Sequence, residues 1–71
     1  MIPSQLLEQA IGLHRSGGLD QAEKLYDEIL AAKPNHVVAR QMRGILRMQQ
    51  GRFEEAVAEF DAALAVDPRA I

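Results

Sequence analysis

The sequence predicts an all-α domain built from two consecutive helix–turn–helix units. Alanine and leucine are the commonest residues, threonine is absent, and no segment alternates apolar and polar residues as a half-buried strand would. The chain also matches itself at a single offset, and a fixed period of about 34 residues indicates a repeat architecture. The identical pairs are Ile11/Ile45, Gly17/Gly51, Ala22/Ala56, Asp27/Asp61, Leu30/Leu64, Ala31/Ala65 and Pro34/Pro68.

The first unit is expected to contain two helices. The first runs over residues 4–15 and ends at a pair of glycines, which break the helix. The second runs over about residues 20–32 and begins at Asp20, which forms a capping-box-like pair with Glu23. Pro34 stops this helix, because the residue before a proline avoids the helical region.

The second unit repeats this plan. Asn35 is a good N-cap for a helix over about residues 37–50. Gly51 then turns the chain, and a helix over about residues 54–66 ends before Pro68. Four helices with short turns leave no room for a sheet.

These features resemble the tetratricopeptide repeat, which has a period of about 34 residues. The family pattern is a small residue in the first helix, a glycine turn, a small residue early in the second helix, an aromatic residue and a closing proline. Those positions hold Ala10, Gly17, Ala22, Tyr26 and Pro34, then Gly44, Gly51, Ala56, Phe60 and Pro68. The resemblance implies a single domain over residues 1–71, with repeats at about 3–36 and 37–70. It also implies a right-handed α–α superhelix, here without a capping helix.

The small residues are expected to set the distance between the helices of each hairpin. Ala10 should face Ala22, and Gly44 should face Ala56, with the aromatic residue of each copy beside the contact. Ala31, like its counterpart in the second copy, is expected where the next helix packs.

The second copy departs from the family pattern at three positions of its first helix, which the family usually fills with large apolar residues. These positions hold Leu6, Gln9 and Leu13 in the first copy and Arg40, Arg43 and Arg47 in the second. The arginines share one helix face. They form either a site for an anion or an acidic peptide, or a polar end of the array whose arginines pair with neighbouring acids. The acids expected nearby are Glu54, Glu55, Glu59, Asp61 and Asp67, together with Asp27 and Glu28.

The resemblance further implies that a partner binds in a concave groove lined by the first helix of each copy. The groove positions hold Ser4, Leu7, Ile11 and His14, then Val38, Gln41, Ile45 and Met48. The set is largely apolar, so an apolar or helical segment of another protein is the expected ligand. Members that bind carboxylate-ended tails use Lys and Asn where this chain has Leu7 and Ile11, so that activity is not expected. Alternatively, a further helix or a second protomer covers the same residues.

No catalytic arrangement is found in the sequence, and we expect the protein not to be an enzyme. His14 is expected to be a surface histidine near a helix end, with no nucleophile beside it. There is no cysteine, and no metal, cofactor or nucleotide site is expected. The net charge of −2 argues against nucleic-acid binding. No segment is long and apolar enough to cross a membrane, and a cytoplasmic location is expected.

The expected function is a scaffold module that binds a protein or peptide. The alternatives are a non-catalytic segment of a larger enzyme, for example a glycosyl- or sulfotransferase-like protein, and a homo-oligomerisation unit. Two repeats without a cap leave the last helix open on one side, so the chain is expected to be a fragment that self-associates through its open ends. Alternatively, the three arginines make that end polar enough for a monomer. Gly12 lies in the middle of a predicted helix, and its replacement by alanine is expected to stabilise the fold.

Overall fold

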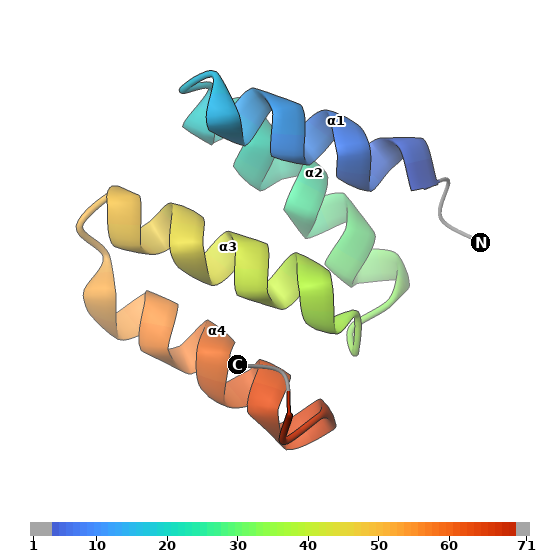
Figure 1. Ribbon diagram of the computed structural model, residues 1–71, viewed down its shortest axis with the longest axis vertical. Helices are drawn as coiled ribbons and strands as arrows, with labels where there is room; N and C mark the ends of the chain where they lie inside the picture. The colour runs from blue at the N-terminus through green and yellow to red at the C-terminus, as the bar shows by residue number, and fades with distance from the viewer. Residues whose placement is uncertain (1–3, 70–71) are drawn as a thin grey trace.

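The computed structural model describes residues 4–69, and this range folds into two antiparallel helical hairpins (Figure 1). The helices are α1 (Ser4–Arg15), α2 (Leu19–Ala32), α3 (Val37–Gln49) and α4 (Phe53–Val66). α1 pairs with α2 and α3 pairs with α4, while α3 also packs against α2. α1 and α3 run side by side in the same direction (Figure 1). The predicted all-α fold of two helix–turn–helix units is confirmed.

Both hairpins turn at a glycine with a left-handed backbone. Gly17 has a φ of 91° and Gly51 has a φ of 79°. After α1, the amide of Gly17 donates to the carbonyl of His14 at 3.2 Å, and the amide of Gly18 donates to the carbonyl of Leu13 at 2.8 Å. The same two bonds recur at the equivalent positions of the second repeat, where α3 ends. This is the Schellman motif, in which a residue without a Cβ satisfies the last carbonyls of the helix.

The N-caps of two helices differ from the prediction. α2 has Gly18 as its N-cap and no side-chain capping bond, so the predicted capping box at Asp20 is wrong. The turn that closes α1 leads directly into α2, and Asp20 therefore lies inside the first turn. α3 is capped by His36, whose Nδ1 accepts a hydrogen bond from the amide of Ala39 at 3.1 Å. Asn35 lies in the preceding turn, one residue too early to cap this helix.

The main apolar core lies where α1, α2 and α3 meet. Its buried members are Ala10, Ala22, Tyr26, Ile29, Leu30, Ala39 and Leu46. The expectation that Ala31 would pack at this junction is wrong, since Ala31 is exposed. The inward stripe of α2 passes through Ile29 instead, and Ala63 is the buried equivalent in α4.

Gly44 sets the distance between α3 and α4 by a close contact with an aromatic ring. A Cβ at Gly44 would lie 2.9 Å from Cε1 of Phe60, closer than real Cβ atoms come. The predicted small-residue contact is therefore made mainly against Phe60, while Ala56 is buried nearby in the same helix. Gly12 is different, because a Cβ there would meet nothing within 4 Å.

Candidate functional site

The predicted groove lies over α1 and α3, and α3 contributes its most exposed part. Leu7 and Ile11 on α1 are partly buried. Val38, Ile45 and Met48 on α3 are 40–47% exposed. The side chain of Ser4 lies outside the described part of the structure. The groove positions therefore form an uncharged, partly apolar surface.

A shallow hollow of about 420 Å³ lies on this surface. It is lined by Gln41, Met42, Ile45 and Phe60. Three of these side chains are apolar, and Gln41 supplies one amide that can donate or accept a hydrogen bond. The hollow can therefore receive an apolar side chain and fix its orientation with a polar contact, but it holds no group suited to covalent chemistry.

His14 does not lie on the surface as the sequence suggested. It is 8% exposed and hydrogen-bonded through both ring nitrogens. Its Nε2 donates to Oε1 of Gln49 on α3 at 2.6 Å, which leaves Nδ1 to accept from the Tyr26 hydroxyl at 3.2 Å. Burial raises the pKa of Tyr26. His14 was predicted as an open groove residue, but Gln49 and Tyr26 enclose it, and it joins α1, α2 and α3.

The three arginines of α3 converge on one acid of α4. Glu59 is 3% exposed. Arg40 lies 3.0 Å from Oε1 of Glu59, and Arg47 lies 3.3 Å from Oε2. Arg43 also bonds Oε2 through its Nε. The sequence placed Glu59 among several acids near the arginines, but it did not single this residue out as their shared partner.

Two acids of α2 complete the ion-pair cluster. Arg43 lies 2.6 Å from Asp27, and Arg47 lies 3.4 Å from Glu23. The arginines are therefore bonded within the protein, between α2, α3 and α4. This is the arrangement of the second interpretation, and the geometry gives no support to a site for an external anion.

The cluster replaces apolar side chains of the first repeat. The counterpart of Glu59 in the first repeat is Leu25, which packs against the apolar core. Burial alone would raise the pKa of Glu59, but the hydrogen bond from Arg43 and the charges of Arg43, Arg47 and Arg40 outweigh it and lower the pKa. The second repeat has arginines where the first has leucines, and it has an acid where the first has Leu25. This joint change is the sequence signal that could have identified the pairing.

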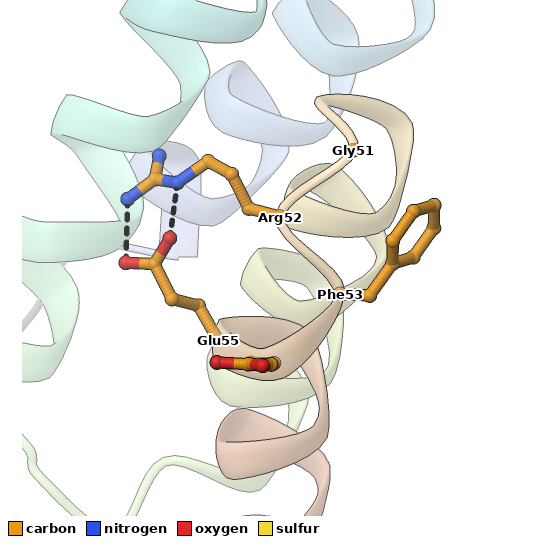
Figure 2. A pocket seen from close by; sticks show the side chains of 5 residues that line it. Gly51, Arg52, Phe53 and Glu55 are labelled. Atoms are coloured by element: carbon orange, nitrogen blue, oxygen red, sulfur yellow. Dashed lines mark hydrogen bonds and ion pairs between the residues drawn. The ribbon is translucent and has the colours of Figure 1, made fainter.

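A second hollow of about 420 Å³ lies at the turn between α3 and α4 and is lined by residues 51–55. Figure 2 shows that the side chains of Arg52 and Glu55 meet there, whereas Phe53 points away from them. Arg52 donates two hydrogen bonds to Glu55, at 2.5 and 2.8 Å, and the pKa of that carboxyl is lowered. Since Arg52 also bonds Glu23 at 3.2 Å, its guanidinium is already occupied. Phe53 is 63% exposed, and no sequence pattern marked it as a surface residue.

In the part of the chain that the structure describes, no helix combines the length and the apolar character needed to span a membrane. Within residues 4–69, no three His, Asp or Glu side chains are grouped so that they could hold a metal ion.

Known proteins resemble this chain in sequence. The profile of the tetratricopeptide repeat matches residues 9–71, which include both hairpins apart from the start of α1. A protein of Mus musculus described as FK506-binding protein-like is 42% identical over 43 residues. The matched segment is 61% of this chain but 12% of the mouse protein, so the chain is similar to a small part of that relative.

Proposed function

This chain belongs to the tetratricopeptide repeat family, as its sequence predicted, and we propose that its concave groove binds an apolar, helical segment of a partner protein. Repeats of this family are typically non-catalytic protein-interaction modules. The observation that carries the finer proposal is the exposed apolar row of Val38, Ile45 and Met48 beside the hollow on α3.

The chemistry of the groove favours an apolar ligand. Neither the α3 row nor Leu7 and Ile11 on α1 carries a charge, so the groove offers no counter-ion to a charged segment. Removing apolar surface from water contributes a favourable free energy of about 25 cal/mol per Å² buried. A helix with apolar residues on one face suits such a surface, because residues three and four apart lie along one line.

At one end of the groove, a hydrogen bond joins its two helices. The bond between His14 and Gln49 joins the C-terminal ends of α1 and α3. A preformed surface loses less conformational entropy when a ligand binds. This supports a docking surface that exists before the partner arrives.

A peptide-display selection tests the proposal. A library of amphipathic helical peptides is selected on the protein, and the affinity of the selected peptides is measured by titration calorimetry. Ile45→Asp places a charge in the groove, whereas Phe53→Asp places the same charge at an exposed apolar position of α4. We expect Ile45→Asp to weaken binding roughly tenfold or more and Phe53→Asp to leave it unchanged.

Selected peptides that bind Ile45→Asp as tightly as the original protein would contradict groove binding. Circular dichroism of both variants provides the control, because two folded proteins with different affinities separate a binding effect from a folding effect.

A further inference from the structure

The surface of α2 that α3 covers recurs on α4, where nothing in residues 4–69 covers it to the same degree. The equivalent pairs in the two repeats are Glu23/Val57, Tyr26/Phe60, Asp27/Asp61 and Leu30/Leu64. On α2, Tyr26 is fully buried and Leu30 is 6% exposed. On α4, Phe60 and Leu64 are only partly buried, and Val57 is 56% exposed. We call Val57, Phe60, Asp61 and Leu64 the α4 face.

The contacts between α2 and α3 show what kind of helix fits such a face. Arg43 of α3 bonds Asp27, and Arg47, four residues later, bonds Glu23. Ala39 and Leu46 of α3 are fully buried in the cluster that includes the apolar residues of α2. A helix that fits α2 therefore combines a small residue, a leucine and two arginines on one side.

The α4 face keeps one half of this pattern and changes the other. Asp61 occupies the place of Asp27, and no ion pair of Asp61 is found in the described range. Val57 replaces Glu23, so an arginine opposite it would be desolvated without a partner. We propose that the α4 face binds an amphipathic helix of another protein that has an arginine for Asp61 and, four residues later, an apolar residue for Val57.

A second copy of this chain does not supply such a helix. The free outer side of α1 has Glu8, Gln9 and Gly12, all exposed, where α3 has Met42, Arg43 and Leu46. It supplies Leu13 for Val57 but no arginine for Asp61. An acid and an amide there neither bury apolar surface nor neutralise Asp61. Pairing of two α4 faces would bury two Asp61 carboxylates in one interface, and neither face has a cation to neutralise them. Charge complementarity therefore favours a different chain.

The α3 segment itself provides the probe. A labelled peptide of residues 36–50 that carries Arg47→Leu has the predicted pattern, and the unchanged peptide is its matched control. We expect saturable binding of the variant peptide by fluorescence anisotropy, and binding of the unchanged peptide that is weaker by roughly tenfold or more. In the protein, Val57→Glu restores the acid found on α2 and should reverse this preference.

The remaining protein variants locate the site. Asp61→Arg should weaken binding of the variant peptide by roughly tenfold. Glu28→Arg, the same charge change at an exposed position of α2, should leave the affinity unchanged. Val38→Asp places a charge in the proposed concave groove, at an exposed residue that does not line the hollow beside Phe60, and should leave this binding intact. A peptide that loses affinity with Val38→Asp and not with Asp61→Arg would overturn the α4 assignment while leaving groove binding standing.

Short isolated helices are only marginally stable in water, so a tethered form of the peptide provides a second test. Joining the variant peptide to Ile71 by a flexible Gly/Ser linker raises its effective concentration. The melting temperature should then rise, and Asp61→Arg should remove the increase. No increase on tethering together with no binding of the free peptide, or sedimentation that shows a dimer abolished by Val57→Glu, would overturn the proposal.

Discussion

Glu59 of α4 accepts a hydrogen bond from Arg40 of α3 at 3.0 Å, although the equivalent residues of the first repeat, Leu25 and Leu6, are both apolar. The second hairpin thus uses charge where the first uses apolar packing. The fold depends on these ion pairs, because a Glu59 carboxylate buried without its arginines would strongly destabilise the folded protein.

Replacing Glu59 with glutamine should lower the free energy of unfolding by about 3 kcal/mol near pH 7, because it leaves the arginines without their shared acid. Chemical denaturation followed by circular dichroism measures the loss. Glu54→Gln, at an exposed position of the same helix, should change stability by about 0.5 kcal/mol or less. Equal effects of the two changes would contradict the role of Glu59.

The advantage of Glu59 over glutamine should depend on pH. Its pKa in the folded protein is lowered, so the folded state holds the charged form more strongly than the unfolded chain, in which a glutamate has a pKa of about 4.3. The stabilisation is complete above the unfolded pKa and is lost as the pH falls through the folded pKa. Urea denaturation of both proteins from neutral to acidic pH should show the two free energies converging below about pH 4. A constant difference over that range would rule out this linkage.

Exchanging the whole cluster for its counterparts in the first repeat should be tolerated. The exchange consists of Arg40→Leu, Arg43→Gln, Arg47→Leu and Glu59→Leu. Buried ion clusters replaced by apolar residues often gain about 1–4 kcal/mol, because the charges no longer lose hydration on folding. Thermal denaturation should show a melting temperature equal to or above that of the original protein. The same exchange with Glu59 retained is the control and should be strongly destabilised, since its charge is then buried alone.

The same substitution at two helical glycines should have opposite effects. Gly12→Ala should stabilise the protein by about 1 kcal/mol, since a Cβ there has open space and alanine is the better helix former. Gly44→Ala should destabilise it by about 1–3 kcal/mol, because the new Cβ meets the Phe60 ring. Thermal denaturation distinguishes the two. Adding Phe60→Leu to Gly44→Ala should recover part of the loss, and no recovery would mean that the ring is not the cause.

Removing the His14 ring should destabilise the protein, because the buried Tyr26 hydroxyl would lose its hydrogen-bond partner. His14→Leu removes the acceptor for the buried Tyr26 hydroxyl and should cost about 1–3 kcal/mol. The double variant His14→Leu with Tyr26→Phe removes both polar partners and should be less destabilised than the sum of the two single variants. Additive effects in this double-mutant cycle would show that the hydrogen bond makes no net contribution.

The exposure of three α3 residues of the proposed groove was predictable, because it depends on the repeat period and on which residues share a helix face. Val38, Ile45 and Met48 are exposed on α3 as the pattern indicated. His14 was misassigned, since its burial depends on Gln49, a residue of another helix that comes 35 positions later. Spacing within one helix does not reveal such a cover.

The sequence by itself determined the helices, the turns and the family. Helix propensity, the proline stops and the need for a residue without a Cβ at Gly17 and Gly51 are local effects that act over a few residues. Only the tertiary structure decided that Glu59 would bind all three arginines, and that the α4 face would lack the cover that α2 has. These outcomes depend on which side of each helix a neighbour removes from water, and that is set by packing between segments distant in the sequence.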